Sequence, residues 1–261
     1  MLEHTPPTRW DIVRAIAGRE IAIASKRKLV RLLFLGSLIP PLVLGVFLVV
    51  KTLVEGAGFP LPWDPLARFI EVQLGPVLLL ALAVGTPSVA RDRGEDVLFL
   101  YATRPVTPWS YTWGKMLAVA APCVGLLLLP GVLIAALRLG LLTDVGVGEA
   151  ADLLLRVALV AVFMAIAYAG LCVGASAAAK KARWALVTAF SAIMIPSLVA
   201  SFVWRRDQYP LDAANAAATL AERLFAEPWD SHGTVALLVL LAWAALGSLV
   251  TATTVRREMR P

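Results

Sequence analysis

The segment Met116–Leu137, MLAVAAPCVGLLLLPGVLIAAL, is apolar from end to end and holds no charged residue. About 20 such residues in a helix cross the roughly 30 Å hydrocarbon core of a bilayer, since each residue adds about 1.5 Å. A spanning segment has to bond its own backbone polar groups, which makes it helical. Five further runs complete a prediction of six transmembrane helices, and they are Leu32–Val50, Val72–Ala90, Val157–Ala179, Trp184–Trp204 and Thr234–Val255.

The overall composition supports the same fold class. The chain is 59% hydrophobic and 16% charged, whereas a soluble domain carries about 25% charged residues. We therefore expect an all-α membrane protein in which residues 1–261 form one transmembrane domain. Its expected parts are an N-terminal helix over 1–31, a six-helix bundle over 32–255 and a short tail over 256–261.

The placement of the basic residues predicts the orientation of the bundle. With six spans, both termini lie on one side, together with the loops 91–115 and 180–183. Of the 24 Lys and Arg residues, 17 fall on that side. The positive-inside rule then places both termini in the cytoplasm. The net charge of +6 therefore reflects topology, and we expect no binding to nucleic acid.

The N-terminal segment shows the pattern of an amphipathic helix. Thr8 and Asp11 have the spacing of a capping box. Apolar residues then recur at helical spacing on one face, with basic residues off it. This stripe consists of Trp10, Val13, Ala17, Ile21 and Ala24. Such a helix lies in the membrane interface, with its basic residues toward anionic headgroups. The alternative is a solvated basic helix that only fixes the topology.

The motifs of enzymes and of ion-driven transporters are missing from the sequence. Ion-driven transporters carry ionisable residues near the middle of the membrane, and all six runs lack them there. The patterns HExxH, GxSxG and GxxxxGK[ST] do not occur, so we expect neither catalysis nor a cofactor bound by this chain. Cys123 and Cys172 lie inside runs, where we expect buried packing residues rather than metal or redox sites.

A dense charged segment separates the second run from the third. It reads ARDRGEDVLFLYATRPVTPWSYTWGK over Ala90–Lys115. Acidic residues at its start suit a helix N-terminus, and Val97–Tyr101 gives that helix an apolar face. Pro105 ends the helix because the residue before a proline avoids the α region. Thr107 as N-cap and Pro108 as first residue start the next one. The segment is either a rigid elbow that receives force from a soluble partner or an ordinary structured loop.

This segment resembles the signature of the ABC-2 type transporter permeases, the membrane subunits of one group of ABC transporters. The signature has an acidic, glycine-containing start, an apolar helix, an Arg-Pro-Val step, and a Tyr and Gly-Lys before the third span. Many members have an arginine soon after the Pro-Val step, where this chain has Pro108. The matching residues are Asp92, Gly94, Glu95, Leu98, Leu100, Arg104, Pro105, Val106, Tyr111, Gly114 and Lys115.

The resemblance implies a permease without enzymatic activity of its own, in a bacterial or archaeal cytoplasmic membrane. It implies pairing with a second copy or a paralogue, and with two ATP-binding subunits that would hold the ATP and Mg²⁺. The helix after the second span would be the coupling helix, seated in a groove of the ATPase. Its candidate contacts are Asp92, Arg93, Glu95, Asp96, Leu98, Phe99, Tyr101 and Arg104.

Two functions are open under this resemblance. The first is an exporter, for which the apolar runs favour a lipid-like or amphiphilic substrate. The second is a mechanotransmitter that drives an extracytoplasmic partner bound at Arg205–Gly233 and moves no substrate. A membrane anchor or enzyme subunit is disfavoured, because the sequence has no catalytic cluster and does have the elbow.

Two local patterns complete the prediction. Gly170 and Gly174 form a GxxxG pattern, whose small face allows close helix approach either within the subunit or in a dimer. In the last outer loop, Asp212 is the expected N-cap of a short alanine-rich helix that Pro228 closes.

Overall fold

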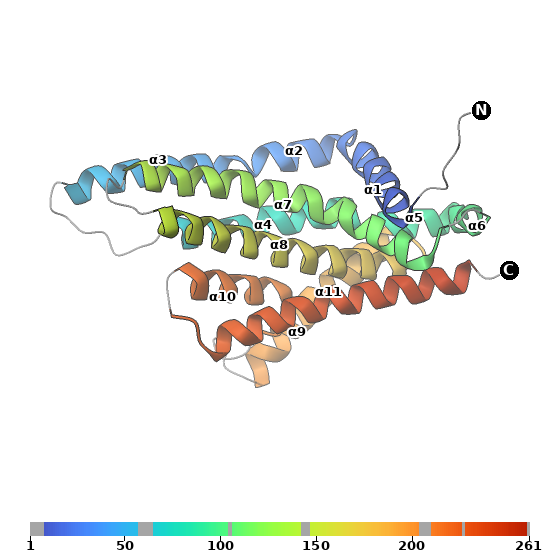
Figure 1. The fold of residues 1–261 in the computed structure, drawn as a ribbon. Coiled ribbons are helices and arrows are strands. Elements are labelled where there is room, and N and C mark those ends of the chain that lie inside the picture. Colours follow the sequence, from blue (N-terminus) through green and yellow to red (C-terminus); the bar gives the residue numbers. More distant parts are fainter. Residues whose placement is uncertain are drawn as a thin grey trace, which may run out of the picture.

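The computed structural model describes residues 8–56, 65–103, 106–141, 147–203, 210–225 and 228–259, and the structural statements below refer to them. These residues form helices joined by short turns, with no β-strand among them (Figure 1). The predictions for Arg104, Trp204 and Arg205 fall outside the described residues. The helices are α1 Arg9–Ser25, α2 Lys28–Gly36, α3 Ile39–Gly56, α4 Pro65–Gly85, α5 Ser88–Gly94, α6 Val97–Ala102, α7 Pro108–Leu141, α8 Val147–Ala178, α9 Ala182–Val203, α10 Ala213–Phe225 and α11 Ser231–Glu258.

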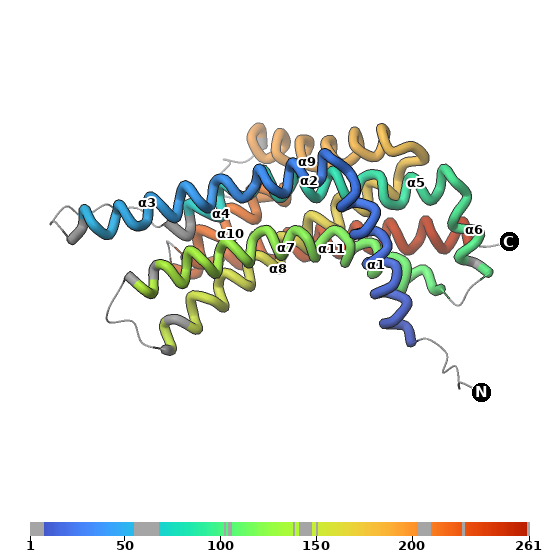
Figure 2. The backbone as a smooth tube through the Cα atoms, turned by 90° about the horizontal axis from the view of Figure 1, so that it is seen from above, coloured from blue at the N-terminus to red at the C-terminus, as the bar shows by residue number. Residues whose placement is uncertain are grey.

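Six segments are long and apolar enough to cross a membrane, which confirms the predicted all-α membrane fold. Each of them overlaps one of the predicted runs. The two chain ends lie at the same end of the bundle as α5 and α6, and we call it the terminal end (Figures 1 and 2). The six segments are Lys28–Val54, Arg68–Gly94, Pro108–Leu137, Ala151–Ala178, Ala182–Phe202 and Ser231–Glu258.

The first span is two helices rather than the single helix expected. The chain breaks at Ser37 and Leu38 because Pro40 and Pro41 follow, and a proline has no N–H to continue the helical bonding. In a continuous helix the N–H of residue 41 would bond the Ser37 carbonyl. Gln73 of α4 supplies the missing donor, with its Nε2 2.9 Å from that oxygen. The buried amide of Gln73 thus stabilises a break inside the apolar region.

The second span breaks in the same way. Helix α4 ends at Gly85, and Pro87 removes the N–H that would have bonded the Ala83 carbonyl. Arg27, in the hinge between α1 and α2, donates to that carbonyl at 3.2 Å. The short helix α5 then continues toward the terminal end, so the predicted run to Ala90 is interrupted at Thr86 and Pro87.

Helix α1 begins with the predicted capping box. Asp11 N donates to Thr8 Oγ1, and Thr8 N donates to the Asp11 carboxylate. The helix crosses α7 at the terminal end (Figure 2). Of the apolar stripe, Val13, Ala17 and Ala24 are buried by this packing, whereas Trp10 and Ile21 are exposed. The close crossing depends on Gly114 of α7, where a Cβ atom would lie 2.8 Å from the Cβ of Ile16.

Helix α8 is the centre of the bundle and packs against α7, α9 and α11. Its predicted small-residue face meets α11. A Cβ on Gly170 would lie 2.6 Å from the Ala244 Cα, and one on Gly174 would lie 2.7 Å from the Gly247 Cα. The GxxxG pattern therefore serves packing within the subunit, which settles the alternative left open by the sequence.

Residues 213–225, between α9 and α11, fold back into the bundle as helix α10. Asp212 caps it as predicted, accepting from Ala214 N at 3.1 Å and Asn215 N at 2.8 Å. Its small residues are buried against α4, α8 and α11, in the half of the bundle remote from the terminal end (Figure 1). Helix α11 runs to Glu258. The tail expected from residue 256 is therefore helical at its start.

Candidate functional site

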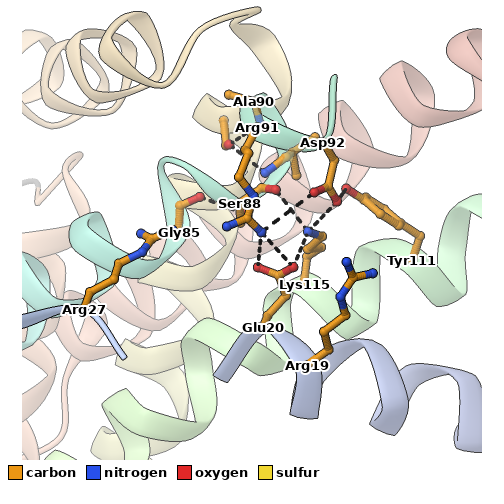
Figure 3. Close-up of polar contacts among 12 residues, drawn as sticks. Arg19, Glu20, Arg27, Gly85, Ser88, Ala90, Arg91, Asp92, Tyr111 and Lys115 are labelled. Carbon is orange, nitrogen blue, oxygen red and sulfur yellow. Dashed lines mark hydrogen bonds and ion pairs between the residues drawn. The ribbon is translucent and has the colours of Figure 1, made fainter. Parts of the chain in front are cut away.

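Four charged residues meet in the interior at the terminal end, and we call them the charge cluster: Glu20, Arg91, Asp92 and Lys115 (Figure 3). They come from α1, α5 and α7. The Lys115 ammonium is fully buried and lies 2.6 Å from Asp92 Oδ2 and 2.9 Å from Glu20 Oε1. Arg91 Nη2 lies 3.2 Å and 3.3 Å from the two oxygens of the Glu20 carboxylate.

The charge cluster is electrically balanced and closely hydrogen-bonded. Two carboxylates face two cations, which is what a site removed from water requires, because an unpaired buried charge costs several kcal/mol. The remaining bonding capacity is also used. Lys115 donates to the Ser88 carbonyl at 3.0 Å, and the Tyr111 hydroxyl donates to Asp92 Oδ2 at 2.8 Å. The cluster therefore joins three helices through a network of ion pairs and hydrogen bonds.

Two tyrosines connect the charge cluster to α6. Tyr101 packs edge-on against Tyr111, with ring centroids 5.4 Å apart, and its hydroxyl accepts from Arg19 of α1 at 3.4 Å. Burial, followed by the nearby Asp92 carboxylate, raises the pKa of Tyr101. The Tyr101 hydroxyl thus stays protonated well above neutral pH. The neutral Tyr101 side chain therefore connects α6 to α1 and α7.

Helix α5 is also fastened to the end of α8. The Ser176 hydroxyl accepts from Val89 N at 3.0 Å and Ala90 N at 2.9 Å, so a side chain of α8 caps the N-terminus of α5. That hydroxyl donates in turn to the Thr86 carbonyl at 2.7 Å. In the other direction, Arg93 of α5 donates to the Ala177 carbonyl at 2.6 Å. Each helix supplies the terminal bonds that the other lacks.

Arg93 additionally links α5 to the C-terminal end of α11. Its Nε donates to Glu258 Oε1 at 2.6 Å. The segment 88–102, which we call the elbow, is therefore held by α1, α7, α8 and α11. Beside it lies a groove of about 680 Å³, whose lining includes Asp96, Phe99, Lys180 and Arg257.

The elbow consists of two short helices instead of one helix with an acidic first turn. Helix α5 ends at Gly94, and Asp96 has a left-handed backbone with φ of 52°, which turns the chain before α6 starts at Val97. Asp92 therefore lies in the last turn of α5. Thr107 starts α7 as predicted, since its Oγ1 accepts from Ser110 N at 3.1 Å.

The structure narrows the set of residues expected to contact a partner. Glu95, Asp96 and Phe99 are exposed on the elbow. Asp92 and Leu98 are not available as surface contacts, because they are buried, with exposed fractions of 5% and 2%. Arg93 and Tyr101 are engaged with other helices of the same chain. Leu100, which is 62% exposed, joins Phe99 as the second apolar surface residue.

Sequence reasoning missed Glu20 and Ser176 as site residues. A signal for Glu20 was present, because it lies three residues after Ala17 and four before Ala24, and so falls on the buried face of α1. Ser176 lies in a small-residue stretch of α8 that is typical of packing alone. Tyr111, Gly114 and Lys115 were singled out by the resemblance, and in the structure Tyr111 and Lys115 contact Asp92 while Gly114 lies against Ile16 of α1.

Chemistry other than ion pairing is not visible at this site. Across the described residues, no group of three or more His, Cys, Asp and Glu side chains is arranged to hold a metal ion. Cys123 and Cys172 are fully buried and free. The arrangement links the elbow to α1, α7 and α8 through ion pairs and hydrogen bonds.

No protein-family model and no curated protein matches this chain.

Proposed function

We propose that this chain is the membrane-spanning subunit of an ATP-driven transporter of the ABC-2 type, an exporter whose ATP is hydrolysed on a separate protein. The observation that carries the proposal is the elbow, which is locked to four helices on its inner side and carries exposed apolar and acidic residues on its outer side. A surface loop without a mechanical role needs no such anchoring.

The outer side of the elbow has the composition of a protein-binding site. Phe99 and Leu100 are large apolar residues that are 63% and 62% exposed, next to the acidic Glu95 and Asp96. Buried apolar anchors carry most of the energy of an interface, whereas exposed ion pairs contribute only about 0.2–1 kcal/mol each. In this proposal Phe99 and Leu100 hold the ATPase. Glu95 and Asp96, together with the basic residues that line the groove beside the elbow, set its orientation.

The remaining parts of the proposal follow from the resemblance. A second copy or a paralogue completes the transporter, both termini lie in the cytoplasm, and the membrane is the cytoplasmic membrane of a bacterium or archaeon. The distribution of basic residues supports this orientation. Movement of the ATPase would push α5 and α6, and the charge cluster would pass that displacement to α1 and α7.

Co-purification with an ATPase tests the proposal. A tagged chain is expressed together with candidate P-loop ATPases from the same genome, and the ATPase retained after detergent extraction is quantified. We expect Phe99→Asp combined with Leu100→Asp to lower retention about tenfold or more, because two anchors are lost. Trp109→Asp is the matched control, since it changes an exposed aromatic residue of α7 outside the groove. The proposal fails if no ATPase is retained by the unmodified chain, or if both variants retain it equally.

A second candidate, the mechanotransmitter, is favoured by the packing of α10. This helix of the last outer loop contacts α4, α8 and α11. It is further tied to the bundle by Arg156, whose Nη1 donates to the Leu224 carbonyl at 2.6 Å. Movement of α8 and α11 at the elbow would therefore displace the outer surface near α10. Stimulation of the reconstituted ATPase by a soluble extracytoplasmic protein, and not by amphiphiles, would select this candidate over transport.

A further inference from the structure

A groove of about 360 Å³ opens at the terminal end between α1, α2, α4 and α7. Its walls are formed by apolar side chains from all four helices, among them Ile21, Val30, Phe34, Leu80 and Pro122. Ser25 and Arg31 are the polar residues among those that line it. The groove thus offers carbon surface along its length and a polar group only near the hinge between α1 and α2.

The hinge beside the groove supplies Ser25 and Arg31 to its lining and is strongly basic; its four basic residues are called the rim below. Lys26, Arg27, Lys28 and Arg31 lie within six consecutive positions, with no acidic residue between them. The two arginines donate to neutral oxygens: Arg27 to the Ala83 carbonyl and Arg31 to the Lys26 carbonyl, each at 3.2 Å. In the part of the chain that the structure describes, no carboxylate pairs with any of the four.

The nearest acidic residue of α1 cannot neutralise this rim. Glu20 is committed to Lys115 and Arg91 in the charge cluster. The rim therefore keeps its full positive charge beside an apolar groove. A ligand that matches both parts has a negatively charged head and a hydrocarbon tail.

The position of the groove in the fold selects the source of that ligand. The first candidate span begins at Lys28, so the hinge lies where the chain enters the membrane. The lining residues of α4 and α7, including Leu80 and Pro122, lie toward the ends of those helices nearest the elbow. The groove therefore runs from headgroup depth into the hydrocarbon region.

We propose that this groove binds one anionic phospholipid of the bilayer, with an acyl chain against the apolar walls and the phosphate at the basic hinge. The tail gives little selectivity, because the surrounding lipid is equally apolar. Selectivity comes from the head, since each Lys or Arg near an anionic lipid surface favours it about fivefold. The proposal rests on the membrane fold and does not depend on the proposed transporter function.

A second groove of the protein provides an internal comparison. It lies between α3 and α7, has a volume of about 500 Å³, and is lined by apolar residues that include Leu42, Val46 and Leu133. Among the described residues, no basic side chain lines it. It should accept a hydrocarbon chain from any lipid or detergent without a preference for the headgroup.

Native mass spectrometry of the full chain in detergent tests the proposal. The delipidated protein is titrated separately with phosphatidylglycerol and phosphatidylcholine that carry identical acyl chains. We expect the first phosphatidylglycerol to bind about tenfold or more tightly than the first phosphatidylcholine. Equal binding of the two lipids by the unmodified protein overturns the proposal, and this comparison requires no variant.

Two variants locate the site. Lys26→Gln combined with Arg31→Gln removes two of the four basic charges of the hinge, and most of the preference for phosphatidylglycerol should be lost. The matched control, Lys180→Gln with Lys181→Gln, removes two charges at the same end outside the groove and should leave the preference unchanged. An equal effect of both pairs would indicate unspecific attraction and would contradict the proposal.

A groove-filling variant separates the tail from the head. Ala118 lines the groove on α7, and Ala118→Phe would place a ring in it. Tight binding of the first phosphatidylglycerol should be lost even though all four basic residues are retained. Unchanged binding would place the lipid elsewhere. Retention volume and helical circular dichroism confirm that each variant is folded.

Discussion

At the scale of single residues, Lys115 is the most consequential side chain of the site. Its ammonium is fully buried, and its two carboxylate partners come from helices far apart in the sequence. The pairs add little net stability over an apolar replacement of the whole cluster, but removal of one partner leaves a buried charge without compensation.

We predict that Lys115→Met destabilises the protein by about 3–5 kcal/mol. The change leaves Glu20 and Asp92 with only Arg91 to balance them. Denaturant titration of the detergent-solubilised protein gives the free energy of unfolding and so measures the loss of stability. Lys181→Met removes an exposed lysine at the same end and should have little effect.

A compensating variant makes this prediction sharper. Lys115→Met combined with Asp92→Asn restores the charge balance, so part of the lost stability should return. Two results would mean that the cluster is not a coupled unit. One is that Lys115→Met is as stable as the wild type, and the other is that the double variant loses the sum of the two single effects.

At the scale of helices, the contact between α8 and α11 sets the closest approach in the bundle. A Cβ atom on Gly247 would lie 1.9 Å from the Gly170 carbonyl oxygen, a distance that no real contact allows. The two helices therefore have to separate if a side chain is added at this position. Small residues at such crossings allow the backbone contacts that hold membrane helices together.

Gly247→Ala should consequently lower stability by about 1–3 kcal/mol, the range expected for overpacking. Gly125→Ala in α7 is the control, because nothing lies within 4 Å of its added Cβ atom. Thermal stability measured by size-exclusion chromatography after heating distinguishes them. If both variants unfold at the same temperature, the contact between α8 and α11 is looser than described.

The sequence predicts helices better than it predicts how they meet. Hydropathy located all six spans, since a hydrocarbon core imposes length and composition on each segment independently. The prolines also mark the breaks in the first two spans. The donors that compensate for them, Gln73 and Arg27, could not be identified, because they depend on which helices pack together.

The same limit applies to the candidate site. The resemblance pointed to Asp92, Tyr111 and Lys115 as a group along the chain. Glu20, which pairs with Lys115, lies 95 positions before it and becomes a neighbour only when α1 crosses α7 at Gly114. The sequence also could not predict which residues of the elbow are exposed. Leu98 was expected as a surface contact, but the turn of the elbow at Asp96 buries it.

At the scale of the whole molecule, the two ends of the bundle differ in chemistry. The terminal end carries the elbow, the charge cluster and the basic hinge, whereas α10 packs into the remote half. Orientation in the membrane therefore decides which solution the elbow faces, and the proposed function requires that it face the cytoplasm.

We predict opposite accessibility for two single cysteines. Glu95→Cys on the elbow should react with a membrane-impermeant maleimide only from the cytoplasmic side, and Glu149→Cys near the start of α8 only from the other side. Both positions are exposed, and the native Cys123 and Cys172 are fully buried. Inside-out and right-side-out vesicles provide the two measurements. Labelling of both positions from one side would contradict the six-span topology.

The proline breaks also have a consequence for how this chain can change over evolutionary time. Gln73 is useful because Pro41 leaves the Ser37 carbonyl without a backbone donor, and Arg27 stands in the same relation to Pro87. A lineage that replaces Pro41 by alanine regains the backbone bond and is then free to lose the glutamine. Loss of the glutamine first would leave the buried Ser37 carbonyl without a donor and lower stability. We therefore expect each proline and its distant donor to change together among relatives, with the proline replaced first.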